Sequence, residues 1–315
     1  MKFLNKTVQK LKRLNTLIEL IYNQSKQSEF IIKRQFLEFS LFYNIQNYDN
    51  IPGTFNSDNK QIEPEIIISL TTYGKRLQEV WLTIESLMQQ TRRADKIILW
   101  LGEEDYKKPL PAALEIQKQK GLEIRKCKDT GSYTKLIPAL KEYPDSIIIT
   151  VDDDALYDCE LIDRLYQSYI SNPTAIHAAR THVMIFDEQG NLKNYNNWKW
   201  WSSETNNPKH LFFTGVGGVL YPPDSLDKEV FNEENFLKLS PKADDVWFNA
   251  MALKKGTKVV KINTKDPKGE DFITNENVQD IGLKFHNTLE NNGNDIQIKA
   301  VYDFYKLYDK LKTLD

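Results

Sequence analysis

The stretch Ile147-Ile148-Ile149-Thr150-Val151-Asp152-Asp153-Asp154 is the part of the sequence that decides the fold. Its first five residues are all β-branched, which is typical of a strand covered on both faces of a sheet. Similar strand patterns occur at 66–70, 96–101 and 122–126, and helical patterns separate them. Strands and helices that alternate in this way predict an α/β fold with an open, mostly parallel sheet flanked by helices.

The chain is expected to have three parts: a helical N-terminal extension and linker at 1–63, a main domain at 64–290 and a C-terminal helical tail at 291–315. Within the extension, apolar residues recur at helical spacing from Phe3 to Ile21 among several lysines, which predicts an amphipathic basic helix. Such a helix can lie on an anionic membrane surface or pack on its own domain, and the sequence leaves both open. The Asn- and Asp-rich stretch 44–63 is typical of a linker.

Composition narrows the classes of protein that this chain can belong to. With 42 Lys and Arg against 44 Asp and Glu, the net charge of -2 provides no general field for nucleic acid, so we expect no nucleic-acid partner. The two cysteines, Cys127 and Cys159, have no paired metal-ligand spacing. We expect a cytoplasmic protein, with possible contact to the inner face of the membrane, because neither a membrane-spanning apolar run nor a secretory signal is evident.

Three consecutive carboxylates directly follow the apolar strand. If the segment stays extended, Asp152 and Asp154 project in one direction and Asp153 in the opposite one. Two convergent carboxylates repel each other unless a cation joins them, and hard oxygen ligands suit Mg²⁺ or Mn²⁺, which complete their shell with water and phosphate oxygens. The sequence therefore predicts a divalent metal at Asp152 and Asp154 beside a phosphate-bearing ligand. A solvated turn that caps the next helix, with Asp158 as the cap, is the alternative.

This acidic strand end resembles the Asp-x-Asp motif of the GT-A glycosyltransferases, and four further features between Ile66 and His286 follow the order of that family. The resemblance implies a GT-A-like fold with Mn²⁺ or Mg²⁺ as cofactor. It also implies transfer of a sugar from a nucleotide diphosphate, with a UDP-sugar as the expected donor. The acceptor would be a hydroxyl of a saccharide or glycolipid, in glycan or surface polysaccharide synthesis.

The turn Thr71-Thr72-Tyr73-Gly74-Lys75-Arg76 follows the first strand, where the family cradles its nucleotide. Tyr73 could stack on a base, and Arg76 could contact the diphosphate bidentately. An ordinary charged surface loop is the alternative. Further along, Lys135 could approach the donor or could pair with Asp129 or Asp154 instead.

Three glycines mark the mouth of a later apolar strand, in the stretch Phe213 to Tyr221. Glycine allows the backbone to approach a ligand closely, and the stretch is similar to the family's glycine loop, although a β-bulge or tight bend would have the same pattern. The resemblance thus places the following residues in the donor site: Thr71, Thr72, Tyr73, Arg76, Lys135, Asp152, Asp153, Gly217 and Gly218.

An acidic pair, Asp244 and Asp245, begins a helix that runs to about Lys254 and ends at Gly256. In inverting GT-A enzymes the second acid of a similar pair removes the proton of the acceptor, which implies that Asp245 is the catalytic base. Asp244 occupies a position where the family usually has Glu, and it is assigned to the acceptor side. Favourable interaction of both acids with the helix dipole is the alternative.

Two further features complete the predicted site. The resemblance makes His286 a candidate metal ligand, although a lone histidine is more often a satisfied polar residue. Trp198, Trp200 and Trp201 lie among asparagines, a composition suited to an acceptor sugar, although aromatic residues usually fill a core.

The predicted reaction is a direct displacement at the anomeric carbon with inversion. Two other classes of function stay open. A metal-dependent nucleotidyltransferase would use a similar acidic strand end, but it would be expected to have an early glycine- and basic-rich phosphate loop, and no such glycine series follows Leu70. A noncatalytic carbohydrate-binding protein would bind sugar without metal or turnover.

Overall fold

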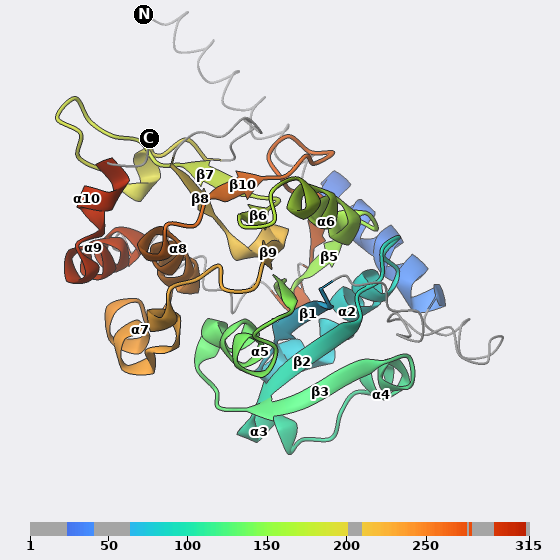
Figure 1. Ribbon diagram of the computed structural model, residues 1–315. Helices are drawn as coiled ribbons and strands as arrows, with labels where there is room; N and C mark the ends of the chain where they lie inside the picture. The colour runs from blue at the N-terminus through green and yellow to red at the C-terminus, as the bar shows by residue number, and fades with distance from the viewer. Residues whose placement is uncertain (1–23, 41–63, 201–209, 276, 279–292, 313–315) are drawn as a thin grey trace, which may run out of the picture.

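The computed structural model describes residues 24–40, 64–200, 210–275, 277–278 and 293–312. Its centre is a seven-stranded sheet in the order β10-β6-β9-β4-β1-β2-β3 (Figure 1). In that order the strands are Val259–Lys261, Ile176–Ala178, Val219–Tyr221, Ile147–Thr150, Ile66–Thr71, Lys96–Gly102 and Leu122–Cys127. Strand β9 runs antiparallel to both of its neighbours, and the other adjacent pairs are parallel. The predicted open, mostly parallel α/β sheet is confirmed.

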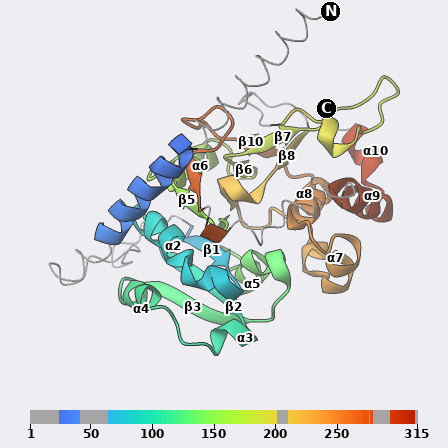
Figure 2. The same ribbon diagram turned by 180° about the vertical axis from the view of Figure 1, so that it is seen from behind.

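Helices cover both faces of this sheet (Figures 1 and 2). One face packs against the helix of residues 24–40, α2 (Val80–Met88), α4 (Ala112–Gln119) and α6 (Leu161–Ser171). The other face packs against α5 (Ile137–Glu142), α7 (Glu233–Leu239), α8 (Asp244–Lys255), α9 (Gly293–Tyr305) and α10 (Leu307–Lys312). Successive side chains of a strand point to opposite faces, so Ile66 and Ile68 enter the first core and Ile67 enters the second.

Shorter elements complete the fold. Two small antiparallel pairs join β5 (Ala155–Tyr157) to β11 (Phe272–Thr274) and β7 (Thr181–Val183) to β8 (Leu211–Phe213). The remaining helical turns are α3 (Glu103–Tyr106), η2 (Gly74–Gln78), η3 (Gly131–Lys135), η4 (Tyr195–Asn197), η5 (Gly215–Gly217) and η6 (Lys228–Phe231).

Both terminal regions contribute helices to the body of the protein. The predicted basic helix from Phe3 to Ile21 and the linker at 44–63 lie outside the described residues. Residues 24–40 form a helix that packs on the sheet through the buried side chains of Phe30 and Leu37. In the predicted tail, α9 and α10 pack on α8 and bury residues such as Tyr302.

The carboxyl ends of six strands meet at one edge of the sheet, because β4, β1, β2, β3, β6 and β10 all run in the same direction. In open α/β sheets ligands bind outside this edge. The acidic residues after β4 and the turn after β1 both lie there. The antiparallel strand β9 begins at the same edge, so the glycine segment that precedes it lies there as well.

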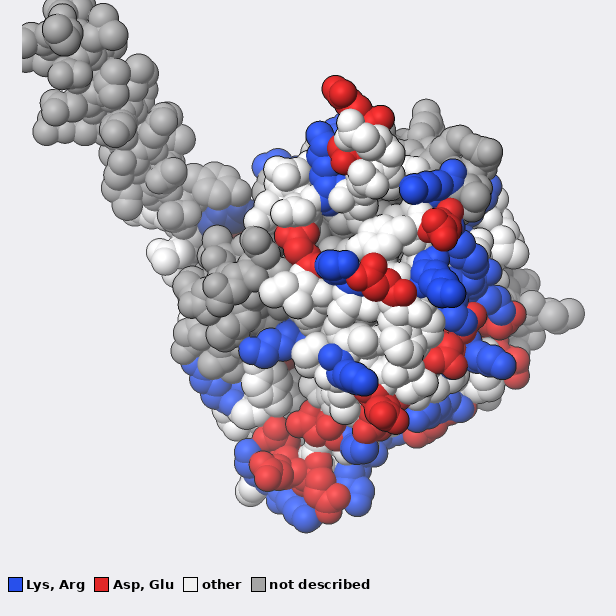
Figure 3. All heavy atoms as spheres, turned by 90° about the vertical axis from the view of Figure 1, so that its left-hand side faces the viewer, with Lys and Arg blue, Asp and Glu red and all other residues white. Residues whose placement is uncertain are grey.

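The face of the protein shown in Figure 3 is mixed in charge. Lys and Arg side chains alternate with Asp and Glu side chains over the face shown in Figure 3. Large exposed apolar side chains include four on the helix of residues 24–40, namely Ile31, Ile32, Phe36 and Phe39. Within the described ranges, no helix combines the length and the apolar character that crossing a bilayer requires.

A buried serine ties the central strands to the turn η3. The Ser69 hydroxyl donates to the Lys135 carbonyl at 2.5 Å and accepts the Trp100 indole N–H at 2.8 Å. Ser69 and Trp100 are essentially inaccessible to solvent, so water cannot replace the partner in either hydrogen bond. Ser69 thereby fixes the backbone that carries the Lys135 side chain.

We expect Ser69→Ala to lower the free energy of unfolding by about 1–3 kcal/mol, because the Trp100 N–H stays buried without its acceptor. Urea unfolding followed by tryptophan fluorescence measures this change. Ser171→Ala, at the exposed end of α6, is the matched control and should alter stability by less than about 0.5 kcal/mol. Equal stability of the two variants would contradict the role given to Ser69.

Candidate active site

The acidic residues after β4 form a turn, and two of their carboxylates pair with one arginine. Arg76 Nη1 lies 2.6 Å from Asp153 Oδ1, and Nη2 lies 3.1 Å from Asp154 Oδ2. The Thr72 hydroxyl donates to the other oxygen of Asp153 at 2.6 Å. The expectation that Asp153 points away from Asp154 is wrong, because the chain turns at these two residues instead of staying extended. Both carboxylates therefore reach the same guanidinium.

The turn after β1 uses most of its polar groups internally. Arg76 is only 7% exposed, and its Nη2 also donates to the Val278 carbonyl at 3.3 Å. The Thr71 hydroxyl donates to the Trp100 carbonyl at 2.9 Å. Tyr73 is 46% exposed, with its ring centroid 5.9 Å from Arg76 Cζ. In the predicted nucleotide loop, Tyr73 thus presents a ring to solvent, whereas contact of Arg76 with a diphosphate stays a prediction.

Lys135 joins the acidic turn to the start of α8. Its Nζ lies 2.8 Å from Asp152 Oδ1 and 3.0 Å from Asp244 Oδ2. The alternative prediction that Lys135 pairs with Asp129 or Asp154 is therefore wrong. Burial disfavours the charged ammonium, but the carboxylates of Asp152, Asp244 and Asp245 outweigh burial and raise the pKa of Lys135 well above its ordinary value. Lys135 therefore stays positively charged between these acids.

Asp245, the predicted base, lies in the first turn of α8. Its Oδ1 accepts the Gly215 N–H at 3.0 Å. Burial, Asp244 and Asp152 raise the pKa of Asp245 to about 7, although Lys135 and the Gly215 N–H oppose this shift. Ala243 occupies the N-cap position of α8, where no side chain accepts a hydrogen bond from the first turn of the helix. The two acids thus lie where the helix dipole favours them, and their side chains also face Lys135 and the glycine segment.

Gly215 is the glycine that meets this charged cluster. A Cβ at Gly215 would lie 2.7 Å from Lys135 Nζ, 3.2 Å from Asp245 Oδ1 and 3.5 Å from Asp152 Oδ1. A side chain at this position would push the Lys135 ammonium group, the far end of a flexible side chain, away from its present place, so glycine allows the closest approach. The predicted donor residues of this segment are Gly217 and Gly218, and the sequence alone does not single out Gly215.

Gly217 and Gly218 have different neighbours. A Cβ at Gly217 would lie 2.8 Å from Arg180 Cβ, and one at Gly218 would lie 3.1 Å from a Leu161 methyl group. Gly218 also has φ +93, a conformation that favours glycine. These two glycines thus shape the segment, and their predicted contact with a donor stays a prediction.

Tyr157, on β5, links the acidic turn to the glycine segment, and the sequence analysis missed it. Its hydroxyl accepts the Asp152 N–H at 3.0 Å and donates to the Val216 carbonyl at 2.9 Å. The side chain is 1% exposed. The sequence gives little indication of this role, because a tyrosine on a short strand does not reveal which segment its hydroxyl contacts.

The loop after β10 packs beside the same glycines. Gly269 has φ +79, and a Cβ there would lie 2.0 Å from the Ala179 carbonyl oxygen, so this position requires glycine. Arg180 follows β6 at the same edge, and its carbonyl accepts the Thr214 N–H at 3.1 Å. Arg180 Nε lies 3.8 Å from the Glu270 carboxylate. Arg180 is thus a cation near the site that the sequence analysis missed.

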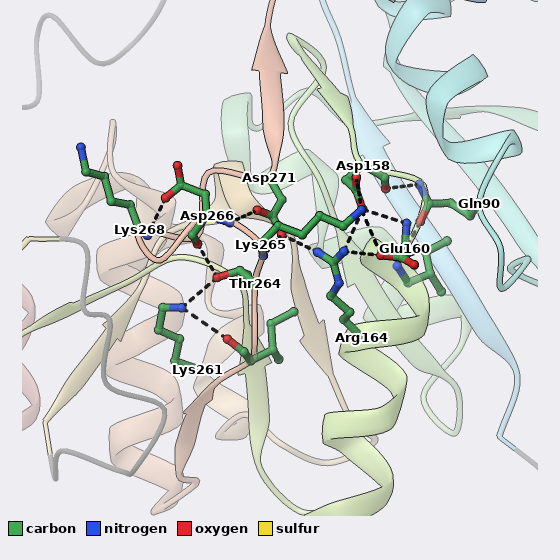
Figure 4. A network of polar contacts seen from close by, with 12 residues as sticks. Gln90, Asp158, Glu160, Arg164, Lys261, Thr264, Lys265, Asp266, Lys268 and Asp271 are labelled. Atoms are coloured by element: carbon green, nitrogen blue, oxygen red, sulfur yellow. Dashed lines mark hydrogen bonds and ion pairs between the residues drawn. The ribbon is translucent and has the colours of Figure 1, made fainter.

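A network of charges holds this loop in place (Figure 4). Asp271 accepts the backbone N–H groups of Lys265 and Asp266 at 2.8 and 2.6 Å and also pairs with Arg164. Lys265 Nζ lies 2.9 Å from Asp158 Oδ2. Asp158, predicted as a possible helix cap, is thereby part of the network that fastens the loop to α6.

The structure describes two of the three predicted acceptor tryptophans, and their contact with an acceptor stays a prediction. Trp198 is 5% exposed, and its indole N–H donates to the Lys193 carbonyl at 2.7 Å, so the core alternative describes it. Trp200 is partly buried and stacks on His182 with ring centroids 5.4 Å apart. Its N–H donates to the Tyr195 carbonyl at 3.1 Å. Trp201 and His286 lie outside the described residues.

Carboxylates outnumber the basic side chains of the site, so the site has the charge to attract a cation. Among the residues that the structure describes, no group of three His, Cys, Asp or Glu side chains is arranged to hold a metal. However, Arg76 and Lys135 face five carboxylates, which leaves three negative charges uncompensated when all five are ionised: Asp152, Asp153, Asp154, Asp244 and Asp245. The side chains of Asp152 and Asp154 are 29% and 15% exposed, and their oxygens are donors that suit Mg²⁺ or Mn²⁺.

A comparison with protein families finds no match, and neither does a comparison with curated proteins. Among solved structures, the chain is similar to CMP:2-keto-3-deoxy-manno-octonic acid synthetase in complex with CTP, with 12% identity, a TM-score of 0.36 and coverage of 62% of this chain and 88% of that chain. For the mannosyltransferase PcManGT from Pyrobaculum calidifontis, in complex with GDP-Man and Mn²⁺, these values are 13%, 0.40, 74% and 63%. For 4-diphosphocytidyl-2C-methyl-D-erythritol synthase they are 12%, 0.39, 66% and 92%. The likeness is partial, and the function is therefore argued from the site.

Asp245 should make stability depend on pH. In the folded protein the carboxyl group of Asp245 has a pKa of about 7, above the ordinary value of about 4. Protonation of this group therefore favours folding at low pH. This contribution to stability is lost as the pH rises through about 7. We expect Asp245→Asn to gain about 1–2 kcal/mol relative to wild type between about pH 5 and about pH 8. Urea unfolding at several pH values measures the difference.

The matched control is Asp145→Asn, because Asp145 is exposed in the turn before β4. Its stability difference from wild type should stay constant, within about 0.5 kcal/mol, over the same pH range. A pH-independent difference for Asp245→Asn would show that the Asp245 carboxyl group does not titrate as described.

Proposed function

We propose that this chain is a metal-dependent glycosyltransferase that moves a sugar from a nucleotide diphosphate, with a UDP-sugar as the expected donor, to a hydroxyl of a saccharide or glycolipid in glycan or surface polysaccharide synthesis. The observation that carries the proposal is the carboxylate of Asp245. It has a pKa of about 7 and is held by the Gly215 N–H beside the pair of Lys135 and Asp152. A base is most effective when its pKa lies near the operating pH, which suits Asp245 to take a proton from a hydroxyl.

In the proposed reaction, the acceptor oxygen forms a bond to the anomeric carbon while Asp245 takes the hydroxyl proton. The bond between that carbon and the diphosphate oxygen breaks, and the nucleotide diphosphate leaves with the electron pair. Attack from the side opposite to the leaving group inverts the anomeric carbon. The Gly215 N–H orients Asp245 by its contact with Oδ1. Lys135 pairs with both Asp244 and Asp152 and so offsets the repulsion between these two carboxylates.

The donor would lie along the carboxyl edge of the sheet. Tyr73, which is exposed there, is proposed to stack on the base. Asp152 and Asp154, with His286 as a further candidate, are proposed to hold Mn²⁺ or Mg²⁺. When bound, such an ion supplies positive charge that neutralises the departing diphosphate. The uncompensated negative charge of the acidic turn supports this assignment.

Nucleotidyl transfer is the second candidate, because an acidic strand end could also hold the metal complex of a nucleoside triphosphate. The two reactions differ in their products: a glycosyltransferase releases a nucleoside diphosphate, and a nucleotidyltransferase releases pyrophosphate. The titrating carboxylate of Asp245 beside the glycine segment favours a reaction in which a hydroxyl loses a proton, such as glycosyl transfer, over nucleotidyl transfer to a phosphate oxygen. Sugar binding without metal or turnover would support the noncatalytic alternative.

Binding of the donor can be tested by thermal shift. We expect Mn²⁺ together with a nucleoside diphosphate to raise the melting temperature, because a ligand at one hundred times its Kd stabilises a protein by about 2.7 kcal/mol. A panel of UDP, GDP and CDP with and without Mn²⁺ also identifies the base. Asp152→Asn should lose the part of the shift that requires Mn²⁺, whereas Asp145→Asn should keep it. If no nucleotide of the panel stabilises the wild type, the proposed donor site is wrong.

Transfer should require the ionised form of Asp245. We expect kcat/KM to rise with pH through about 7 in the wild type, because the carboxylate must be free of its proton to act as a base. Asp245→Asn should keep the nucleotide-dependent thermal shift and lose about 10²- to 10⁴-fold in rate. Release of nucleoside diphosphate from a panel of nucleotide sugars, with a panel of saccharide acceptors, measures the rate. A variant as active as wild type would remove Asp245 as the base.

A further inference from the structure

Arg180 lies at a part of the sheet edge that has no role in the proposed reaction. It follows β6, and the strands beside β6 are, in order, β9, β4 and β1. The glycine segment precedes β9, the acidic turn follows β4, and Tyr73 follows β1. Arg180 therefore lies on the opposite side of the acidic turn from Tyr73. If the base of the donor stacks on Tyr73 and its diphosphate lies at the acidic turn, Arg180 is on the side of the acceptor.

The backbone of Arg180 is held against the segment that orients the candidate base. Its carbonyl accepts the Thr214 N–H at 3.1 Å, and the next residue, Gly215, donates its N–H to Asp245 at 3.0 Å. A Cβ at Gly217 would lie 2.8 Å from Arg180 Cβ, so the glycine segment packs closely on the stem of this side chain. Arg180 and Asp245 are thus connected through two adjacent residues of the glycine segment.

The charge of Arg180 acts on aromatic side chains that Asp245 also approaches. Burial, together with Arg180, lowers the pKa of His182 to about 3. Burial and Asp245 raise the pKa of Tyr195, and Arg180 opposes this shift. Trp200 stacks on His182 with ring centroids 5.4 Å apart, and its ring centroid lies 5.5 Å from that of Tyr195. The guanidinium and the candidate base therefore lie near the same aromatic rings, a surface suited to a sugar ring.

Glu270 faces Arg180 at a distance that is too long for a hydrogen bond. Arg180 Nε lies 3.8 Å from the Glu270 carboxylate, and the two side chains are 16% and 27% exposed. A guanidinium makes its strongest contacts with carboxylate or phosphate groups that accept two of its N–H groups at about 2.7–2.9 Å. The contact with Glu270 lacks this geometry, so an anion that a ligand brings can replace Glu270 at the guanidinium.

A buried hydroxyl opposite Arg180 is a second, independent observation. Arg180 and Thr214 face each other one residue beyond the β7–β8 ladder, which ends at Thr181 and Phe213, so their side chains are on the same face. Thr214 is 5% exposed, and its hydroxyl has no hydrogen-bond partner among the described residues. Buried polar groups are rarely left in this state, because they lose their contact with water. The hydroxyl is therefore suited to a polar group that a ligand brings to this face.

We propose that Arg180 binds a carboxylate or phosphate group of the acceptor, so that the acceptor is an anionic saccharide such as a uronic acid or a sugar phosphate. This inference rests on the proposed function, because it names the substrate whose hydroxyl Asp245 deprotonates. The anion takes the place of Glu270 at the guanidinium, and the Thr214 hydroxyl bonds a neighbouring oxygen. The sugar ring lies against Trp200. The charged contact fixes the orientation of the saccharide, so that one hydroxyl faces Asp245.

Saturation-transfer difference NMR of the full chain tests binding without turnover. The probes are matched sets of sugars: glucose, glucuronate and glucose 6-phosphate, and galactose, galacturonate and galactose 6-phosphate. Each is measured with and without Mg²⁺ and UDP. We expect at least one anionic sugar to bind about tenfold or more tightly than its neutral parent, and added salt to weaken this binding. Comparison of the carboxylate with the phosphate in each set identifies which anion the site takes.

Two variants of the pair should change this binding in opposite directions. Arg180→Gln should lose about tenfold or more in affinity for the anionic sugar and bind the neutral parent within about twofold of the wild type. Glu270→Gln removes the competing carboxylate and should bind the anionic sugar more tightly than the wild type does. If the pair only supported the fold, both variants would bind more weakly, so the opposite signs separate binding from a structural role.

The matched control is Arg92→Gln. It also removes a guanidinium from an ion pair, that with Asp163, but it lies before β2 at the other edge of the sheet. This variant should bind every sugar as the wild type does. The proposal is overturned if no anionic sugar of the panel binds, if none binds more tightly than its neutral parent, or if Arg180→Gln binds the anionic sugar as tightly as the wild type.

Failure here is distinguishable from failure of the proposed function. Arg180→Gln should keep the thermal shift with Mn²⁺ and nucleoside diphosphate, because Arg180 and Tyr73 lie on opposite sides of the acidic turn. If the wild type shows this shift but no preference for anionic sugars, only the acceptor assignment is wrong. If anionic sugars bind through Arg180 but no nucleotide shifts the melting temperature, the donor site is wrong and the anion site stands. Circular dichroism spectra confirm that the variants are folded.

Discussion

The partial neutralisation of the acidic turn by Arg76 and Lys135 is the interaction on which the rest of the site depends. Three carboxylates follow one another at the end of β4, and their mutual repulsion and burial would be costly without cations. Arg76 pairs with Asp153 and Asp154 from the side of β1, and Lys135 pairs with Asp152 from the side of η3. The turn can therefore exist at the sheet edge only because two other segments bring their charges to it.

The same requirement connects the site to the core. Lys135 pairs with Asp244 as well as with Asp152, so α8 and β4 are joined through one ammonium group. The backbone of Lys135 is in turn held by Ser69 in the centre of the sheet. Asp245 lies beside this ammonium, and the surrounding negative charge and burial keep its proton near neutral pH. The geometry that stabilises the fold thus also sets the chemistry of the candidate base.

Close approach of backbones is the second constraint. Gly215 lets the glycine segment lie against Lys135 and Asp245, and Gly269 lets the loop after β10 lie against Ala179. At either position a Cβ would have to displace its neighbours. Tyr157 then joins the glycine segment to the acidic turn through one buried hydroxyl. The edge is consequently a continuous surface built from segments that are far apart in the chain.

The sequence by itself determined the sheet and the strand end at which the acidic residues gather. The β-branched run at 147–151 and the alternation before it are local signals, because burial on both faces and helical periodicity depend on neighbouring residues. It also indicated Asp152, Asp153 and Asp154 at a strand end and Asp245 at a helix start as separate candidates, since acids at these places are visible in the order of residues. Only the tertiary structure decided their partners. Arg76 meets Asp153 across 77 residues, and Lys135 meets Asp244 over a still longer stretch, so no local pattern contains these pairs. Likewise, burial of Trp198 follows from packing between distant elements, which composition alone does not specify.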